Sequence, residues 1–583
     1  MLLAILLLAL RAYHTGPGQP FFADNDDAMR MVVVRDFLNG QNWFDHTQYR
    51  LNTPFGADMH WSRLIDLPIA ILVLLAQPFA GVQGAEIVAG YVWPLLLLAL
   101  FTWLNGRLAL RLVGPQGLLP GMLLPALSVV TISEFDFGRI DHHSVQFILA
   151  QLTILSSMNA LTRPRAALWA GLATATSLAI GTESLPVIVA AILVFGVMFV
   201  ATPSLNAAVR NFGLAFGLST LAHLGLALPP ALWFVPACDA NSIVYAAAAL
   251  AAGLGLVGLT LLPLQRANWP LRLAAAIPAG AAVLALIVLL FPQCLAGPYA
   301  AVDPFLVERW LSAVGEALPL PTGLLQQPVY IVSATIPALI ALGVTLYAAW
   351  RARGADRAAW LILLAFFVVV MAVACIQVRG LRISVALIAP AAAWLITTAR
   401  THYLRRVSPA SVLGLVGAWL GMAGLVWAVL VAQALNALPA QAANDGPGAS
   451  TTCLAPDAYA DLAGLPPERI MTPHDMGAFM LLYTPHAVVS APYHRNNQGL
   501  LDTYRFLNGP IDDAREILQA RGISLVVTCD PMPEMAGQPD AAPDSFVRLA
   551  KEGALPDWLD DVSTSGPLNI YQVRPADPQL PAP

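Results

Sequence analysis

Charge is scarce in this sequence, and lysine is almost absent. Only 11% of the 583 residues are charged, 58% are hydrophobic, and the mean hydropathy is +0.67. Lys551 is the only lysine, and no basic run occurs. This composition excludes an ordinary soluble protein, and the missing basic run excludes nucleic-acid binding. The chain is expected to be a polytopic membrane protein.

Two further absences restrict the kinds of active site that the chain can carry. The five cysteines include no CxxC pair, which excludes a thiolate zinc site. The pair His474-Asp475 has no serine or cysteine nucleophile motif beside it, which argues against a hydrolase. Cys453 and Cys529 both lie in the C-terminal region, and a disulfide between them is possible if that region faces an oxidising space.

Long apolar runs, in contrast, recur along the chain. The opening MLLAILLLALRAY has about ten apolar residues, fewer than the roughly 20 of a spanning helix, so it is a short or tilted first span or a signal-like segment. Twelve further runs lie at 87–104, 116–132, 144–159, 166–184, 185–201, 211–235, 242–264, 271–292, 328–350, 358–377, 380–398 and 410–435. Together they predict about thirteen transmembrane helices. Pro68 and Pro78 interrupt the run from Leu64 to Val82, so an interfacial segment is expected there.

Arginine placement predicts the orientation, because cytoplasmic loops collect positive charge. With a cytoplasmic N-terminus, one side receives Arg107, Arg111, Arg163, Arg165, Arg210, Arg266, Arg272, Arg351, Arg353, Arg357, Arg400, Arg405 and Arg406. The short loops of the other side hold only Arg139, Arg309, Arg379 and Arg382. This asymmetry predicts a C-terminal region outside the cytoplasm, and we expect a bacterial inner-membrane protein with a periplasmic C-terminal domain.

The predicted fold class is an all-α polytopic membrane domain followed by a small α/β domain. The membrane domain covers residues 1–435. Its three polar outer loops lie at about 14–86, 133–143 and 293–327. A linker rich in proline, glycine and alanine follows at 436–450, and residues 451–583 then alternate strand-like and helix-like runs.

Carboxylates crowd the first outer loop. Asp24, Asp26 and Asp27 lie just before an expected amphipathic helix that carries Arg30 and Arg35. Neighbouring carboxylates repel one another, and a hard cation such as Mg²⁺ or Mn²⁺ makes such a cluster favourable. The alternative is a solvated helix start, which aspartate commonly caps.

The second outer loop, in the stretch EFDFGRIDHHSVQFILA, mixes carboxylates with imidazoles. Asp141 and His143 are two residues apart at a helix end, so in an extended turn both could face one ion. Such a mixed set suits Mn²⁺ or Zn²⁺, and ionisable groups at membrane depth usually mark a site. The alternative is an interfacial polar cap, and Glu134 and Asp136 are expected to be supporting or solvated groups.

Two later segments add a carboxylate and two arginines. Glu316 follows the small residues SAVG, where the backbone could approach a ligand closely, or it faces solvent. Arg379 and Arg382 lie at an outer helix end against the positive-inside trend. The forked donors of arginine bind phosphate bidentately, so a pyrophosphate at the membrane surface would explain them, as would lipid head groups.

The order of these motifs resembles the catalytic subunit of oligosaccharyltransferases, in the glycosyltransferase C superfamily. Asp24, six residues before Arg30, matches the first-loop catalytic aspartate, and Asp141-His142-His143 is similar to an Asp-x-His motif. Glu316 matches the end of the fifth-loop motif of that family, and Arg379 its phosphate-binding arginine.

The acceptor motif of the family is only partly present. Pro473-His474-Asp475-Met476-Gly477 resembles the Trp-Trp-Asp-Tyr-Gly signature, but both tryptophans are missing. The residues that would bind the donor are therefore expected to match the family. The chain is not expected to recognise Asn-x-Ser/Thr as the family does.

The resemblance implies transfer of a sugar or oligosaccharide from a polyprenyl phosphate or diphosphate to an acceptor protein or glycan, by metal-assisted inverting displacement. The implied catalytic residues are Asp24, Asp141 and Glu316, and the implied ligands of Mn²⁺ or Mg²⁺ are Asp24, Asp141, His143 and Glu316. Donor phosphate would meet Arg379, Arg382 and Arg139. Acceptor would meet His474, Asp475 and Gly477, and secondary candidates are Asp26, Asp27 and His142.

Two other classes compete with this interpretation. A transporter or flippase would use intramembrane charges as a substrate or proton path, but it would place them near the midplane rather than at outer helix ends. A non-catalytic scaffold could keep the fold, although Asp24, Asp141 and Glu316 argue against it.

Overall fold

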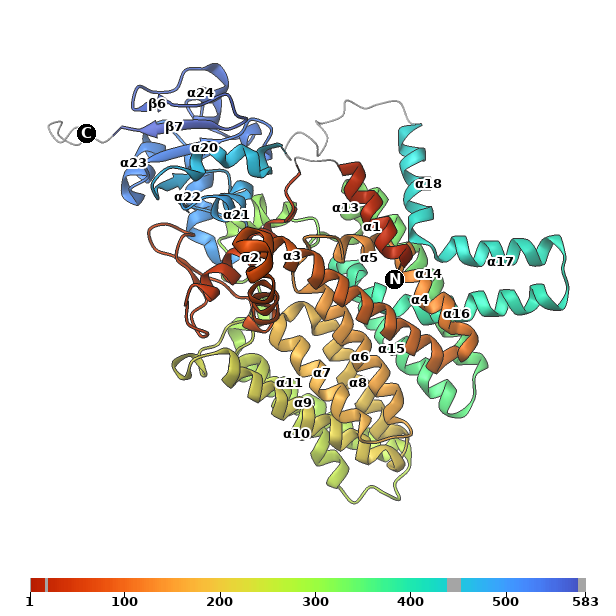
Figure 1. The fold of residues 1–583 in the computed structure, drawn as a ribbon. Coiled ribbons are helices and arrows are strands. Elements are labelled where there is room, and N and C mark those ends of the chain that lie inside the picture. The colour runs from red at the N-terminus through yellow and green to blue at the C-terminus, as the bar shows by residue number, and fades with distance from the viewer. Residues whose placement is uncertain (1, 16–18, 438–451, 575–583) are drawn as a thin grey trace.

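The computed structural model describes residues 2–15, 19–437 and 452–574, which are mostly helical. Long helices form a bundle, and a mixed α/β region lies at one end of it (Figure 1). Most of the predicted linker at 436–450 lies outside the described residues.

Within the described residues, seven helical segments are long and apolar enough to cross a membrane. Six lie in α3 (Arg63–Val113), α10 (Ile243–Leu261), α11 (Trp269–Leu290), α14 (Pro328–Arg351), α15 (Gly354–Ile376) and α16 (Arg379–Arg405), and the seventh is Thr182–Ala201, which contains α8 (Leu185–Ala201). The pair α17 (Pro409–Met422) and α18 (Gly424–Asn436), bent by 81°, adds an eighth if it is one span. The predicted count of about thirteen is therefore not confirmed.

The remaining predicted spans are short, polar or broken in the structure. The helices α1 (Leu2–Thr15), α6 (His143–Ala160) and α7 (Ala166–Ile180) have at most 18 residues. The helix α9 (Asn206–Ala227) is longer, but polar residues such as Arg210 and His223 interrupt its apolar run. The run 116–132, which contains Pro120 and Pro125, folds into α4 (Leu118–Leu123), a 3₁₀ turn and α5 (Val129–Glu134).

The segment Leu64–Val82 is not broken at its prolines, whereas its predicted interfacial position stays a prediction. It is helical through both Pro68 and Pro78, and it forms the first part of α3. The irregularity lies instead at Gly81, whose φ of +69° is a conformation that glycine adopts without a steric penalty. At about 1.5 Å per residue, a helix of this length exceeds the roughly 30 Å of a hydrocarbon core, so α3 is longer than a single span requires.

The first and third outer loops carry short elements. Asp24 caps the helix α2 (Asn25–Leu38), because its carboxylate accepts a hydrogen bond from the Asp26 amide at 3.0 Å. A two-stranded hairpin, β1 (Thr47–Gln48) with β2 (Ala57–Asp58), follows. The third loop contains α12 (Pro304–Arg309) and α13 (Leu320–Gln326).

The C-terminal region is built around a five-stranded mixed sheet with the order β4-β3-β5-β7-β6. Its strands are β3 (Arg469–Met471), β4 (Ala487–Val488), β5 (Leu525–Thr528), β6 (Leu559–Asp561) and β7 (Asn569–Val573). Strand β3 pairs in parallel with β4 and with β5. Strand β7 pairs antiparallel with β5 and with β6. Its main helices are α21 (His474–Tyr483), α22 (Asn497–Asn508), α23 (Ile511–Arg521) and α24 (Phe546–Glu552).

The first outer loop docks directly on this sheet. Leu51 forms a parallel bridge with Val488 of β4, and the Thr53 amide donates to the Val488 carbonyl at 3.0 Å. Helix α2 lies against α21 (Figure 1). Arg35 of α2 donates to the Leu482 carbonyl, so charged and backbone groups both hold the two regions together.

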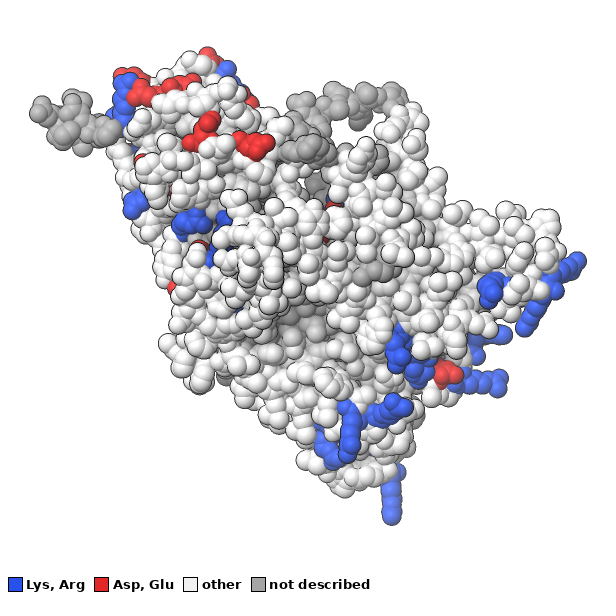
Figure 2. Space-filling view, viewed as in Figure 1, with Lys and Arg blue, Asp and Glu red and all other residues white. Residues whose placement is uncertain are grey.

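Two disulfides lie among the described outer segments. Cys453 is bonded to Cys529, a pairing considered from the sequence, and Cys238 is bonded to Cys294, a pairing the sequence did not suggest. The latter joins the loop before α10 to the start of the third outer loop. Arginines gather at the opposite end of the bundle, remote from the sheet (Figure 2). Both features agree with the predicted orientation, which stays a prediction.

Candidate functional site

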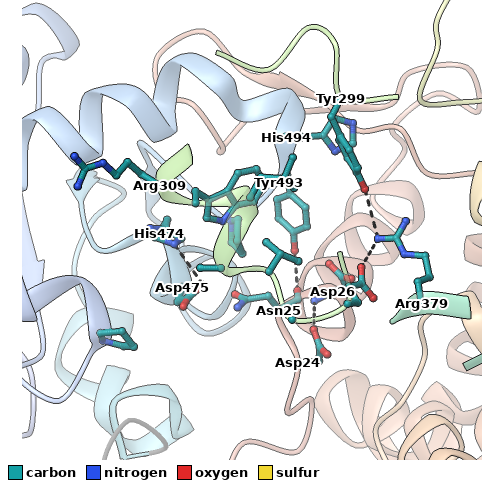
Figure 3. A pocket seen from close by; sticks show the side chains of 18 of the residues that line it. Asp24, Asn25, Asp26, Tyr299, Arg309, Arg379, His474, Asp475, Tyr493 and His494 are labelled. Atoms are coloured by element: carbon teal, nitrogen blue, oxygen red, sulfur yellow. Dashed lines mark hydrogen bonds and ion pairs between the residues drawn. The ribbon is translucent and has the colours of Figure 1, made fainter. Parts of the chain in front are cut away.

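A cavity of about 710 Å³ lies where the outer loops, the outer helix ends and the C-terminal region meet (Figure 3). It brings together most of the residues predicted from the sequence. The predicted residues that line it are Asp24, Asp26, Arg139, His142, His143, Glu316, Arg379, Arg382, His474 and Asp475.

Asp141 lies just behind this lining and is almost fully buried. Its carboxylate contacts both neighbouring histidines, at 2.6 Å from His142 Nδ1 and 3.3 Å from His143 Nε2. Arg30 also reaches it, at 3.5 Å. The predicted Asp141–His143 pairing is thus present in space, with His142 as a third member.

Glu183 closes this cluster on the other side, and sequence reasoning missed it. Its carboxylate lies 3.0 Å from His142 Nε2 and 3.2 Å from His143 Nδ1. Burial would lower the pKa of His142, but the charges of Asp141 and Glu183 outweigh it and raise that pKa to about 10.

Glu316 is held between two arginines. Its carboxylate lies 2.5 Å from Arg379 and 2.8 Å from Arg382. The backbone fixes this pairing, because the Arg379 amide donates to the Glu316 carbonyl at 3.0 Å. Burial would raise the pKa of Glu316, but both guanidinium groups outweigh it and lower that pKa to about 2. Glu316 is therefore a poor base as it stands.

The two arginines extend the network in both directions. Arg379 also contacts Glu183 at 3.2 Å, and Arg382 contacts Glu134 at 3.2 Å. Glu134, expected to be only supportive or solvated, is 3% exposed and has a supporting role of this kind. The start of α16 thus forms a positively charged wall that carboxylates neutralise from both sides.

Arg139 holds the first-loop carboxylates. It contacts Asp24 at 2.8 Å and Asp27 at 2.7 Å. Asp27 is fully buried and also accepts hydrogen bonds from the Ile140 and Asp141 amides, so it fastens the second loop to α2. Asp27 is therefore a packing residue rather than a cavity-facing one.

Asp26 is a first-loop carboxylate that is influenced by the charges of three other acids. Burial first, and then the charges of Asp141, Asp24 and Glu316, raise its pKa well above the ordinary value. Four carboxylates thus repel one another across this part of the cavity. A divalent cation would relieve that repulsion.

The predicted metal set fits in part. Asp141 and His143, with His142, present ligand atoms within 4.8 Å of one another, and Asp141 Oδ2 is buried without a hydrogen-bond partner. One carboxylate and two imidazoles suit Mn²⁺ or Zn²⁺. Asp24 and Glu316 line the same cavity, but arginines occupy their carboxylates.

The opposite wall comes from the C-terminal region. His474 and Asp475 begin α21, and Glu534 lies beside them, 3.2 Å from His474 Nδ1. The Asp475 amide donates to Glu534 at 3.0 Å. Burial, with smaller contributions from the charges of Glu534 and Asp24, raises the pKa of Asp475 to about 6, although His474 opposes the shift. These three side chains form a second group whose atoms lie within 4.8 Å of one another.

Gly477 does not line the cavity. A Cβ there would lie 1.9 Å from the Ser490 carbonyl oxygen, so the glycine is needed for close packing of α21 against the loop after β4. Gly477 therefore matches the glycine of the acceptor signature because the backbone packs too closely there for any side chain.

The shape of the chain has counterparts among solved structures. It aligns with the archaeal oligosaccharyltransferase AglB from Archaeoglobus fulgidus, in complex with an inhibitory peptide and a dolichol-phosphate, with a TM-score of 0.63 and 12% identity. That alignment covers 88% of this chain and 66% of AglB. The same organism's oligosaccharyltransferase in complex with Zn and sulfate aligns with a TM-score of 0.58 and 12% identity, over 89% and 64% of the two chains.

A further alignment joins this chain to ArnT from Cupriavidus metallidurans bound to undecaprenyl phosphate, with a TM-score of 0.42, 12% identity and 97% coverage of each chain. No protein-family model and no curated protein matches the sequence. The AglB alignments confirm the predicted oligosaccharyltransferase-like fold. This chain spans just under two thirds of the AglB length.

Proposed function

We propose that this protein is a membrane glycosyltransferase that transfers a sugar from a polyprenyl-linked phosphate or diphosphate to an acceptor on the extracytoplasmic side. The observation that carries the proposal is the cavity itself. It holds two half-buried arginines, an aspartate-histidine cluster and a third-loop glutamate at the outer ends of membrane helices.

The arginines suit the phosphate of a lipid-linked donor. Arg379 and Arg382 begin a membrane helix, so a polyprenyl tail could remain in lipid while the phosphate lies against them. Their guanidinium groups now pair with Glu316, Glu183 and Glu134, and a phosphate would exchange with these carboxylates. Arg139 is a third candidate, although three carboxylates surround it.

A divalent cation would be held by Asp141 and His143, with His142 and Asp26 beside them and Asp24 and Glu316 facing the same space. When bound, such an ion supplies a Lewis acid for the leaving phosphate. The residues themselves bind and orient: Asp24 and Glu316 are placed to accept hydrogen bonds from an acceptor, and the arginines neutralise charge on the departing phosphate. Because phosphate is a good leaving group, a single inverting displacement needs no covalent intermediate.

The acceptor would lie between the two walls, against His474 and Asp475. We further propose an orientation with this wall in the periplasm of a bacterium. A transporter would place its buried charges near the membrane midplane, whereas the charges around this cavity lie in outer loops and at helix ends.

The test is transfer by the purified protein in lipid nanodiscs, with polyprenyl-phosphate and -diphosphate sugars and Mn²⁺. Wild type should transfer sugar, and Asp141→Ala and Glu316→Ala should abolish transfer. Asp136→Ala is the matched control, because Asp136 lies in the same loop but pairs with Arg11 away from the cavity. Equal rates in wild type and both site variants would overturn the site. Absence of transfer from every donor would overturn the function.

A further inference from the structure

A second aspartate-histidine pair lies on the rim of the cavity, apart from Asp141 and its histidines. His494 Nε2 lies 2.7 Å from Asp239 Oδ2. Asp239 belongs to the loop before α10 and follows Cys238, which is bonded to Cys294. The side chains of His494 and Asp239 are each 14% exposed, so the pair is largely shielded, and His494 lines the cavity.

Asp239 is held in place as an anion. Arg495 donates to its two oxygens at 2.6 and 3.0 Å and also pairs with Asp58. Burial would raise the pKa of Asp239, but hydrogen bonds from His494 and Arg495 outweigh it and hold that pKa well below the ordinary value. A fixed carboxylate of this kind orients the imidazole and selects its tautomer.

The imidazole lies close to the proposed donor site. Its ring packs edge-on against Tyr299 at 5.4 Å between centroids, and the Tyr299 hydroxyl lies 3.4 Å from Arg379 (Figure 3). The preceding residue, Tyr493, donates from its hydroxyl to the Asn25 carbonyl at 2.8 Å, between Asp24 and Asp26. Tyr299 therefore contacts both His494 and Arg379, the arginine that would hold the donor phosphate.

Two carboxylates beside the proposed donor site are already engaged by arginines. Glu316 is paired with two arginines, and Asp24 is paired with Arg139. An imidazole that donates Nε2–H to a carboxylate keeps the lone pair of Nδ1 free to take a proton. A hydroxyl acceptor must lose its proton as it attacks, and a free imidazole nitrogen can take that proton.

We propose that His494, oriented by Asp239, is the general base that deprotonates a hydroxyl-bearing acceptor. This inference rests on the proposed glycosyl transfer. In the step, the acceptor O–H bond breaks and its proton moves to His494 Nδ1, while the acceptor oxygen bonds to the anomeric carbon of the donor sugar. The bond from that carbon to the phosphate oxygen breaks, and its electron pair leaves on the phosphate beside Arg379. His494 later releases the proton to water.

Several groups face this imidazole and shape its response to pH. They are Asp239 and Tyr299 from two outer loops, Arg495 beside it in the chain, and His60, whose ring centroid lies 4.6 Å away. Because the base acts in its neutral form, the rate of transfer should rise with pH on the acidic side.

The experiment compares wild type with His494→Ala and Asp239→Asn in nanodiscs. The probes are polyprenyl-phosphate hexoses as donors, methyl hexosides as hydroxyl acceptors, and an Asn-Val-Thr peptide as an amide acceptor. His494→Ala should lower kcat for the methyl hexoside about 100-fold or more, lose the acidic limb of the pH profile, and recover rate with added imidazole. Asp239→Asn should lower kcat less and keep that limb.

His486→Ala is the matched control for a purely structural role. His486 is a buried histidine of the same region, 2.9 Å from the Leu462 carbonyl and not among the residues that line the cavity, so its loss should lower the melting temperature while keeping the pH profile and most of the rate. Thermal melting and donor-lipid binding of His494→Ala show whether that variant is folded.

Several results would overturn the proposal. They are unchanged transfer by His494→Ala, loss of rate that imidazole does not restore in a folded protein, or transfer by wild type to the peptide alone. No turnover of any donor by wild type would instead overturn the proposed glycosyl transfer on which the inference rests.

Discussion

The cavity wall formed by membrane helices and outer loops holds its carboxylates in ion pairs with arginines, whereas the wall formed by the C-terminal region pairs its carboxylates with one histidine. On the first wall, Arg379 and Arg382 each bridge two glutamates. On the second, Glu534 Oε2 is buried without a hydrogen-bond partner among the described residues. The first wall is therefore preorganised for an anion that replaces carboxylates, and the second for a ligand that donates hydrogen bonds.

The largest effect is expected from the aspartate behind the first wall. Asp141→Asn keeps the size of the side chain but removes the anion that both neighbouring histidines and Arg30 contact. Donor turnover should fall by more than about 100-fold, since removal of groups that merely support a metal ligand already costs about 10- to 100-fold. Transfer and donor hydrolysis measured over a range of Mn²⁺ concentrations check this. Full activity at saturating Mn²⁺ would show that the anion is dispensable.

The next effect concerns donor affinity. Arg379→Gln should raise the KM for the lipid-linked donor about 10- to 150-fold, because a hydrogen bond to a charged group contributes about 1.5–3 kcal/mol. Arg309→Gln is the matched control, because Arg309 ends α12 in the third outer loop and lines the same cavity, but pairs across it with the exposed Asp540 of the C-terminal region. Such surface pairs contribute at most about 1 kcal/mol, so its donor KM should change less than about 5-fold. Similar shifts in both variants would show that Arg379 is not the arginine that binds the donor phosphate.

A smaller effect is expected from the second wall. Glu534→Gln should raise the KM for the acceptor about 10-fold while the donor KM stays the same, because loss of one charge-assisted hydrogen bond weakens only the ligand that donates it. Initial rates measured against acceptor concentration at saturating donor check this. A change in donor KM instead would place the donor on both walls.

The smallest effect is a pH dependence of stability. The pKa of Asp239 is lowered in the folded protein, so the stabilisation it provides is present above its ordinary pKa of 3.8 and is lost as pH falls through the folded value. The melting temperature of wild type should therefore decline faster below about pH 3.8 than that of Asp239→Asn. If the melting temperatures of wild type and Asp239→Asn decline equally from about pH 5 to about pH 2.5, the Asp239 carboxylate does not stabilise the rim of the cavity.

The sequence located much of the first wall because its residues carry local signals. Asp141 and His143 are spaced for one ion, and Arg379 and Arg382 depart from the positive-inside trend. The pairing of Glu316 with both arginines then follows from a backbone contact between the third loop and α16, which no local pattern encodes.

Other partners could not be predicted because they are single residues in unrelated segments. Glu183 stands alone between two apolar helices, Glu534 lies in a short turn, and Asp239 is one acid in an interhelical loop. Each becomes meaningful only when the tertiary fold brings it to a histidine. The count of about thirteen spans stays a prediction, because an apolar run shows composition but not where prolines such as Pro120 and Pro125 redirect the chain.

The contact between α2 and α21 determines when the cavity can exist. Arg35 and the Leu482 carbonyl are 447 residues apart in sequence, and both walls meet across that junction. Contacts this distant form slowly compared with local ones. The first outer loop can therefore reach its final position only after α21 has been synthesised, so the cavity forms late, after the chain of the membrane helices is already made.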